Sequence, residues 1–371
     1  MVRHHVPGPA GTARTPGYVT RGPLPPPRGE RIPAAGALSP PSPTGGPTMR
    51  KSVRAASALL AGLLAGGLAL LPAGPAYAAD PTTMTSGFYT DPDNSALRWT
   101  AANPGDGRAA AIRTSIANTP AARWFGNWSG DIATAAGSYT GRADSADKLP
   151  VLVAYNIPDR DVCAGHSGGG AGSRAAYESW IAAFATGIGN RPAVVILEPD
   201  ALGHESCMTA GQIAERNAML KNAIAQFHTK APNTWVYLDA GNAGWIGAPE
   251  MAQQLAAAGV DGAHGFALNV SNYFTTDQST SYGNAVNSAL RSYGYTKPFV
   301  IDTSRNGNGS NGQWCNPAGR RTGTPSRRGG GAEMLLWIKI PGESDGNCGV
   351  GAGSSAGQFL PEVAYKMIYG Y

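Results

Sequence analysis

Short runs of apolar residues, each ending in a polar cluster, recur along the chain from residue 149 onward. The first, residues 149–156 (LPVLVAYN), is apolar at nearly every position before its end. Continuous apolar runs of this length predict strands that are buried on both faces of a parallel sheet. Five further runs share the pattern, and a weaker one precedes them: 193–200, 234–241, 265–272, 298–304 and 334–341, with 122–126 as the weaker candidate.

Helical patterns separate these runs. Between the first and the second run, Tyr177, Ile181, Phe184 and Ile188 recur at the spacing of one helical face. The next interval repeats this pattern at Ile213, Leu220, Ile224 and Phe227, with Thr209 as a plausible N-cap. We expect further helices near 248–258, 281–293 and 356–369.

Strands that alternate with helices indicate an α/β fold with a parallel sheet and right-handed crossovers. Six or seven such units favour a distorted, TIM-like (β/α) barrel of about seven strands, and a doubly wound sheet is the alternative. We see no internal repeat and no linker to a second module, so residues 79–371 are predicted to form a single domain.

The N-terminal 78 residues differ in composition from the rest. Residues 1–48 contain 12 of the 29 prolines, which predicts a segment that is disordered or untranslated. From Met49, a basic start, an apolar run over 55–71 and the sequence Ala76-Tyr77-Ala78 predict a secretory signal peptide over 49–78. A membrane anchor is the alternative, but the run is short and rich in Ala and Gly. We therefore expect a secreted, extracellular protein that has no membrane contact after cleavage.

The net charge of +5 would suit a nucleic-acid partner, but its distribution argues against one. Residues 1–78 hold eight Lys and Arg against one acid, which leaves 21 basic and 23 acidic residues in 79–371. A protein that binds the phosphate backbone needs a basic surface, and the predicted domain has no basic excess. Nucleic acid is therefore disfavoured.

Acidic residues follow most of the predicted strands. One acid at a strand end often caps the next helix, but acids at most strand ends indicate a shared site, because parallel strands end at one edge. Carboxylates that share a site raise one another's pKa. These acids are Asp159, Asp161, Glu198, Asp200, Asp239, Asp302, Glu343 and Asp345.

Other chemistries lack their motifs. The chain has no His-Glu-x-x-His and no phosphate-binding loop. Its four cysteines form no Cys-x-x-Cys and no Cys/His cluster, so we expect two disulfides rather than a zinc site. Neither a metal nor another cofactor is predicted.

Carboxylates accompanied by exposed aromatic residues suit a carbohydrate substrate, because sugar rings stack on flat aromatic faces. Five tryptophans lie near the predicted strand ends: Trp124, Trp128, Trp245, Trp314 and Trp337. A secreted glycoside hydrolase is the leading hypothesis. A non-catalytic sugar-binding protein and another kind of exported hydrolase stay open.

Five motifs in order resemble glycoside hydrolase family six, a family of cellulases with a distorted, partly open (β/α) barrel. The resemblance runs from about residue 87 to 371. The motifs lie at 155–161 (YNIPDRD), 195–200 (VILEPD), 237–241 (YLDAG), 302–307 (DTSRNG) and 337–346 (WIKIPGESDG).

The resemblance implies a role for each matching residue. Asp200 would be the general acid, and Asp161 would keep it protonated and help to organise the attacking water. Asp345 would be the base, unless water relays the proton to Asp161. The expected substrate-binding residues are Tyr155, Trp124, Asp239, Asn242, Trp245, Asn272, Trp314, Lys339 and Glu343, and the implied disulfides are Cys163–Cys207 and Cys315–Cys348.

The family inverts anomeric configuration, so we expect the carboxyl groups of Asp200 and Asp345 to lie about 6.5–9.5 Å apart. Two departures affect the site: Asn242 stands where the family often has His, and the segment from Arg160 to Cys163 is one residue longer than the family's pattern.

The lengths of the disulfide loops bear on the mode of action. Only 43 residues separate Cys163 from Cys207, and 32 separate Cys315 from Cys348, which fits members of the family with an open cleft. We therefore predict an endo-β-1,4-glucanase that acts as a monomer on cellulose and cello-oligosaccharides, with a cellobiohydrolase as the alternative.

Overall fold

The computed structural model describes residues 79–163 and 168–371. The segment 1–48 and the signal peptide over 49–78 that the sequence predicts lie outside the described residues. Among the residues that are described, no helix has both the length and the apolar character needed to cross a membrane.

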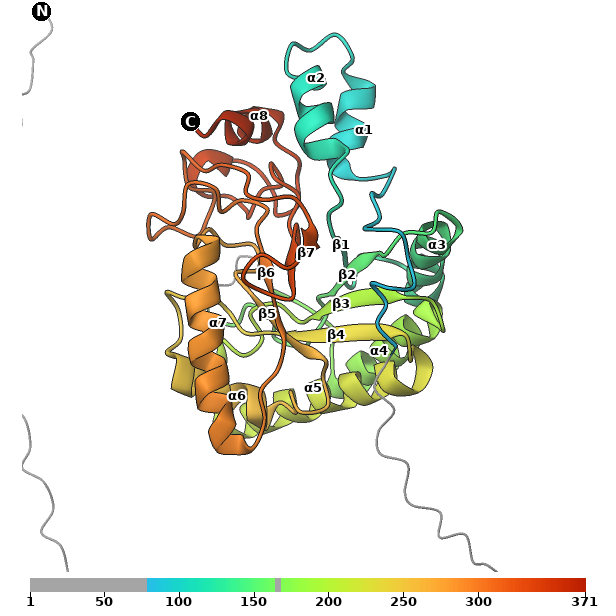
Figure 1. Cartoon of the computed structure of the whole chain (residues 1–371), viewed down its shortest axis with the longest axis vertical. Coiled ribbons are helices and arrows are strands. Elements are labelled where there is room, and N and C mark those ends of the chain that lie inside the picture. Colours follow the sequence, from blue (N-terminus) through green and yellow to red (C-terminus); the bar gives the residue numbers. More distant parts are fainter. Residues whose placement is uncertain (1–78, 164–167) are drawn as a thin grey trace, which may run out of the picture. The chain divides into compact units, whose positions relative to one another are not determined.

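The strands form one curved sheet in the order β1-β2-β3-β4-β5-β6-β8-β7 (Figure 1). Neighbouring strands from β1 to β6 pair in parallel, as do β6 and β8, and β7 pairs antiparallel with β8. Seven described strands are therefore parallel, as predicted. Their bounds are β1 Arg123–Phe125, β2 Val151–Ala154, β3 Ala193–Leu197, β4 Thr234–Asp239, β5 Gly265–Leu268, β6 Phe299–Asp302, β7 Arg327–Arg328 and β8 Met334–Leu336.

The sheet curls into a barrel that stays partly open between β1 and β8. These two strands are not paired, although the backbone N–H of Ala122 donates to the carbonyl of Trp337 at 2.8 Å beside them. A doubly wound sheet would reverse its strand order, whereas β1 to β6 follow one another without a break. The distorted, partly open barrel is therefore confirmed, and the doubly wound alternative is wrong.

Most strands end earlier than their apolar runs predict, because the backbone turns sharply at the carboxyl ends. Glu198 and Asp200 after β3, and Asn269 and Ser271 after β5, all have positive φ angles, between 49° and 66°. Such left-handed backbone costs about 1–2 kcal/mol per non-glycine residue and cannot continue a strand. The strain therefore gathers at the edge of the sheet where the acidic residues lie.

Helices cover the outer face of the sheet (Figure 1). α5 begins after Thr209, which forms a capping box with Gln212, so the predicted N-cap is confirmed. A second capping box, at Thr275 and Gln278, explains why α7 begins before the predicted residue 281. The bounds are α1 Ser95–Ala102, α2 Ala109–Ile112, α3 Ile132–Ser145, α4 Arg174–Ile188, α5 Ala210–Lys230, α6 Ala248–Ala257, α7 Thr276–Leu290 and α8 Pro361–Tyr369.

Two apolar layers hold the sheet between them. Side chains alternate along β3, so that Val195 and Leu197 pack toward the helices while Val194 and Ile196 pack inside the barrel. This burial on both faces explains why the strands appear in the sequence as continuous apolar runs. A third cluster joins α1, α2 and α8 around Trp337, next to the open seam.

Candidate active site

The carboxyl ends of the parallel strands bring the predicted acids into one electrostatic environment. Burial raises the pKa of Asp200 well above its usual value, and the charges of Asp239, Asp161 and Asp345 raise it further. The positive charge of Lys339 acts against this shift and lowers the pKa of Asp200. Asp200 therefore retains its proton far more readily than an ordinary aspartic acid.

Asp239, the last residue of β4, holds the backbone at Asp200. Its Oδ2 accepts hydrogen bonds from the backbone N–H groups of Asp200 at 2.9 Å and Gly241 at 3.2 Å. Burial raises the pKa of Asp239 to about 7, although these two hydrogen bonds lower it. A second carboxyl group of raised pKa thus lies directly beside the loop that carries Asp200.

Asp161 lies in a buried environment beside a histidine. His204 Nε2 is 3.7 Å from Asp161 Oδ1, and burial lowers the pKa of this imidazole, with Asp161 acting against the shift. Next to Asp161 in sequence, the guanidinium of Arg160 lies 4.8 Å from the ring centre of Tyr155 and 5.2 Å from that of Trp128. The two aromatic rings restrict the side chain of Arg160.

Two buried charged residues tie the loops of Asp161 and Asp200 to the rest of the fold. Glu198 Oε2 accepts from the backbone N–H groups of Asn156 and Ile157, both at 2.9 Å. Arg216 on α5 donates to the carbonyl of Asp159 in one loop and to that of Ala201 in the other, both at 2.8 Å. The relative position of the two loops is thereby fixed by Glu198 and Arg216, whose side chains have no exposed surface.

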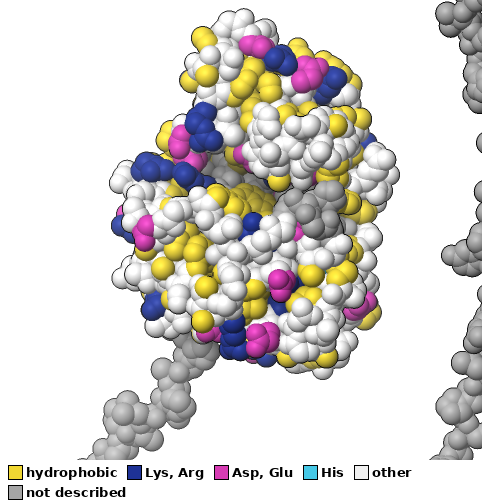
Figure 2. Space-filling view, turned by 180° about the vertical axis from the view of Figure 1, so that it is seen from behind, with side chains coloured by type: hydrophobic (Ala, Val, Ile, Leu, Met, Phe, Trp, Pro, Cys, Tyr) yellow, Lys and Arg dark blue, Asp and Glu magenta, His cyan; other side chains and the backbone are white. Residues whose placement is uncertain are grey.

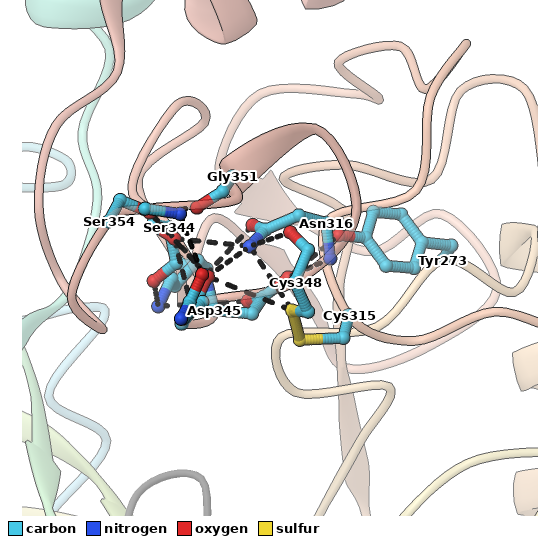
Figure 3. Close-up of a disulfide and its surroundings, with 12 residues drawn as sticks. Tyr273, Cys315, Asn316, Ser344, Asp345, Cys348, Gly351 and Ser354 are labelled. Carbon is cyan, nitrogen blue, oxygen red and sulfur yellow. Dashed lines mark hydrogen bonds and ion pairs between the residues drawn. A yellow bond between two sulfur atoms is a disulfide. The ribbon is translucent and has the colours of Figure 1, made fainter. Parts of the chain in front are cut away.

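Asp345 lies among hydrogen-bond donors and positive charges. Arg305 Nη1 is 3.0 Å from both carboxylate oxygens, and Oδ2 also accepts from the hydroxyl of Tyr273 at 3.1 Å and the backbone N–H of Asn316 at 3.0 Å. Lys339 Nζ is 3.9 Å from Oδ1. Figure 3 shows Asp345 beside Asn316 and the Cys315–Cys348 disulfide.

Aromatic and polar residues predicted to bind substrate gather around this group. The Trp124 ring lies 5.2 Å from the Tyr155 ring at 80°, and its Nε1 donates to the carbonyl of Ile338 at 2.7 Å. Lys339 Nζ lies 5.6 Å from the Trp124 ring centre, which links this aromatic pair to Asp345. Glu343 accepts from the hydroxyl of Ser95 at 2.7 Å, and burial raises its pKa.

Trp245 and Trp314 are partly exposed, at 37% and 45%. The ring of Trp245 lies 5.0 Å from that of His204 in an edge-to-face contact, beside the Asp200 loop. Figure 2 shows a central hollow on the face of the molecule seen from behind, with apolar side chains inside it and Lys and Arg beside it.

The two predicted asparagines shape their own loops. Asn242 Oδ1 accepts from the backbone N–H of Gly244 at 3.0 Å, just before Trp245. Asn272 Oδ1 accepts from the backbone N–H of Tyr273, also at 3.0 Å. Each therefore fixes the turn that leads into an aromatic residue of the site.

Both disulfides implied by the resemblance are present. Cys163–Cys207 joins the loop after β2 to the loop after β3, and Cys315–Cys348 joins the segments on either side of Asp345. The loops of Asp161 and Asp200 are thus joined by one disulfide, and the segment that carries Asp345 is held by the other.

Sequence reasoning did not include several residues that organise the site, although some had a signal. Arg305 lies inside the motif DTSRNG, and Asn316 directly follows a cysteine. Arg216 lies on the apolar face of its helix, between Ile213 and Leu220, where a charged residue needs a buried partner. Arg160 and Glu198 lie inside the motifs YNIPDRD and VILEPD, and Glu198 is one of the predicted strand-end acids, whereas His204 had no comparable signal.

Comparisons with known proteins agree with this geometry. Residues 83–369 match the family model described as "Glycosyl hydrolases family 6". The chain is 71% identical over 314 residues to "Endoglucanase 1" of Streptomyces halstedii, covering 84% of this chain and 98% of that protein. It is 43% identical over 320 residues to "Endoglucanase A" of Thermobispora bispora, covering 84% of this chain and 67% of that one.

A solved structure is similar over most of the chain. It is that of the endoglucanase Cel6 from Mycobacterium tuberculosis in complex with methyl-cellobiosyl-4-deoxy-4-thio-β-D-cellobioside. The TM-score is 0.71 at 38% identity, and the match covers 79% of this chain and 99% of that one.

Proposed function

The chain belongs to glycosyl hydrolase family 6 and is an endo-β-1,4-glucanase, an inverting glycoside hydrolase, and from this premise we propose how its residues divide the reaction. The observation that carries the proposal is the contrast between two carboxyl groups of one site. Asp200 is surrounded by other acids, whereas Asp345 is surrounded by cations and hydrogen-bond donors.

Asp200 is the general acid that protonates the leaving glycosidic oxygen. Its buried environment and the neighbouring charges of Asp239 and Asp161 keep it protonated at a pH where an ordinary aspartic acid is ionised. A carboxylic acid held neutral in this way has a proton to donate when the glycosidic bond breaks. The charges of Asp161 and Asp239 thus support the reaction by keeping Asp200 protonated.

Inversion requires a water molecule to attack the opposite face of the sugar, with about 6.5–9.5 Å between acid and base. The oxygens of Asp345 already accept from Arg305, Tyr273 and Asn316, so little acceptor capacity is left for a proton from water. In our proposal Asp345 is a fixed negative charge that stabilises the oxocarbenium-like transition state. The proton of the attacking water then passes through a second water to Asp161.

The substrate is a β-1,4-glucan such as cellulose or a cello-oligosaccharide. The complex of the Mycobacterium tuberculosis endoglucanase with a thio-linked ligand of this type supports the assignment. Tyr155 presses on the sugar at the bond to be cleaved, Lys339 and Glu343 hold its hydroxyls, and Trp124 stacks on its neighbour. Asn242, Trp245, Asn272 and Trp314 bind units further along the chain.

The two disulfides support an extracellular location, because disulfides persist in oxidising compartments. We infer that residues 49–78 direct export and are removed after Ala78, so that residues 79–371 act as a monomeric enzyme. N-terminal sequencing of the secreted protein tests this inference, with Ala79 as the expected first residue.

The reaction is tested by following viscosity and reducing ends together on carboxymethyl-cellulose. We expect a steep fall in viscosity per reducing end, and a loss of roughly 10²–10⁴-fold in rate for Asp200→Asn. The matched control is Asp277→Asn, an exposed aspartate at the start of α7, which should leave the rate unchanged. Slow release of reducing ends at nearly constant viscosity would indicate attack from chain ends. A fully active Asp200→Asn variant would contradict the assignment of the acid.

A further inference from the structure

Asn316 is bonded to Asp345 in both directions. The backbone N–H of Asn316 donates to Asp345 Oδ2 at 3.0 Å, and Asn316 Oδ1 accepts from the backbone N–H of Asp345 at 2.9 Å. The amide nitrogen of Asn316 donates to the carbonyl of Gly346 at 2.8 Å, the hydroxyl of Ser344 at 3.1 Å and the carbonyl of Cys348 at 3.2 Å. One buried side chain thus binds Asp345 and the residues on either side of it (Figure 3).

The position of Asn316 is itself tightly constrained. Its neighbour Cys315 is bonded to Cys348, and its φ angle of 43° lies in the left-handed region that asparagine tolerates better than most residues. A Cβ atom at Gly349 would lie 2.3 Å from the carbonyl oxygen of Asn316, and one at Gly351 would lie 2.3 Å from its Nδ2. The segment from Cys348 to Gly351 therefore packs directly against Asn316 and leaves it no room to shift.

The other partners of Asp345 contact its carboxylate and not its backbone N–H. Arg305 Nη1 is 3.0 Å from both oxygens, so this ion pair holds the group without distinguishing Oδ1 from Oδ2. The backbone N–H of Asn316 and the hydroxyl of Tyr273 both bind Oδ2, which leaves Oδ1 toward Lys339. Asn316 is the partner that also holds the backbone of Asp345.

We propose that Asn316 is a positioning residue for the reaction, which fixes the backbone and the carboxylate rotation of Asp345 and is itself held by the Cys315–Cys348 bridge. The inference rests on the proposed role of Asp345 in catalysis. It adds that Asn316 holds the carboxylate of Asp345 in the position that stabilises the transition state.

Asn316→Gly tests the proposal, because glycine adopts the same backbone conformation without strain and keeps the backbone donor. Only the side-chain hydrogen bonds are lost. We expect kcat on cellopentaose to fall roughly 10- to 100-fold, as small misplacements of reacting groups do. KM should change little, because the Asn316 side chain is buried against Asp345, Ser344 and Gly346. An unchanged kcat in a folded variant would overturn the proposal.

A double-mutant cycle with Asp345→Ala separates this inference from the role of Asp345. If Asn316 acts through Asp345, the double variant should be no slower than Asp345→Ala alone. Losses that multiply would show that Asn316 acts by another route and would overturn the proposal. An Asp345→Ala variant of full activity would refute the proposed role of Asp345, and the inference about Asn316 would fall with it.

A matched control separates positioning from stability. Asn287 on α7 makes the same kind of tether, because its Oδ1 accepts from Lys297 N at 2.9 Å and its Nδ2 donates to Lys297 O at 2.8 Å. Asn287→Ala should lower the thermal midpoint and leave kcat unchanged.

If Asn316→Gly does not fold, Ser344→Ala removes the hydrogen bond from Asn316 together with those to Gly346 and Ser354. Its control is Ser354→Ala, which loses hydrogen bonds to Ser344, Gly346 and Gly351 but none to Asn316. A smaller fall in kcat at constant KM in Ser344→Ala but not in Ser354→Ala would then support the proposal. No fall in Ser344→Ala, or an equal fall in both variants, would overturn it.

Discussion

Two acidic regions of one site show opposite local chemistry. The region around Asp200 contains Asp161, Asp239 and Glu198, and burial and like charge there raise the pKa of Asp200. Asp345 lies nine residues beyond the end of β8 at Leu336, and its carboxylate is paired with a fully buried Arg305 and lies near Lys339. The first region favours a protonated carboxyl group at Asp200, whereas the second surrounds the carboxylate of Asp345 with cations and hydrogen-bond donors.

Residue type alone therefore does not assign a catalytic role. Both groups are aspartates near strand ends, and both are joined to buried neighbours. What differs is the charge of those neighbours, and an inverting hydrolase needs that difference because its acid must be neutral while a second carboxylate stays ionised. Changes that remove the difference should therefore have the largest effects.

Arg305→Met should have the largest effect on the Asp345 side. The side chain of Arg305 is fully buried, so its loss removes the nearest positive charge from the buried carboxylate of Asp345 and leaves only the more distant Lys339. We expect the free energy of unfolding to fall by about 3–5 kcal/mol, as when one partner of a buried ion pair is removed. Urea unfolding measures this loss. An equal loss in Arg108→Met, whose pair with Asp106 is more exposed, would contradict the argument from burial.

Removal of either disulfide should cost nearly the same stability. The bridges close loops with sequence separations of 44 and 33, which the chain-entropy model values at roughly 4 kcal/mol each. We therefore expect similar unfolding free energies for Cys163→Ser/Cys207→Ser and Cys315→Ser/Cys348→Ser. The pH dependence of activity should differ, since the first bridge lies next to Asp161 and Asp161 raises the pKa of Asp200. Identical pH profiles would contradict the division of the site into two regions.

The sequence predicted the fold well, because apolar runs and helical faces alternate without ambiguity. All seven parallel strands lie within predicted runs, and the helices over 174–188 and 210–230 match their patterns. The errors have a physical cause. Strand ends were placed too late where polar residues adopt positive φ. The helices α1 and α2 were not expected because they are only eight and four residues long, and α3 was not expected because Ala, Gly, Ser and Thr make up most of it.

The acids of the site could be found from the sequence, but their supporting residues could not. Asp161, Asp200, Asp239 and Asp345 follow strands, so topology alone places them at one edge of the sheet. Arg216 and Asn316 act through backbone carbonyls and N–H groups, whose positions depend on the folded loops. Contacts to the backbone leave no pattern in side-chain spacing, which is why these residues needed the structure.

Glu198→Gln should change how stability depends on pH. Burial raises the pKa of Glu198 from 4.5 to about 7, so the folded protein binds an extra proton between these values. Its contribution to stability is therefore complete below about pH 4.5 and is lost as the pH rises through 7. The loss is roughly 3 kcal/mol. Thermal unfolding across pH 4–8 should show a flatter decline in the variant, and an unchanged slope would contradict the raised pKa.

Asp239→Asn should have a smaller effect, and this effect should be on the pKa of the general acid Asp200. Asn can still accept from the backbone of Asp200 and Gly241, so the loop keeps its shape while one negative charge is removed. The pKa of Asp200 should then fall, and the alkaline limb of kcat against pH should move to lower pH by roughly one unit.

The matched control for Asp239→Asn is Asp302→Asn. Asp302 is also a buried aspartate at a strand end that accepts from backbone N–H groups, but it is not among the charges that raise the pKa of Asp200. Asp302→Asn should therefore leave the alkaline limb of kcat against pH unchanged. Equal shifts in the two variants would mean that a general loss of buried charge, rather than the neighbours of Asp200, sets the pH at which the acid loses its proton. An unmoved limb in both would mean that burial alone keeps Asp200 protonated, and the contrast between the two regions would then rest on Asp345 and its cations.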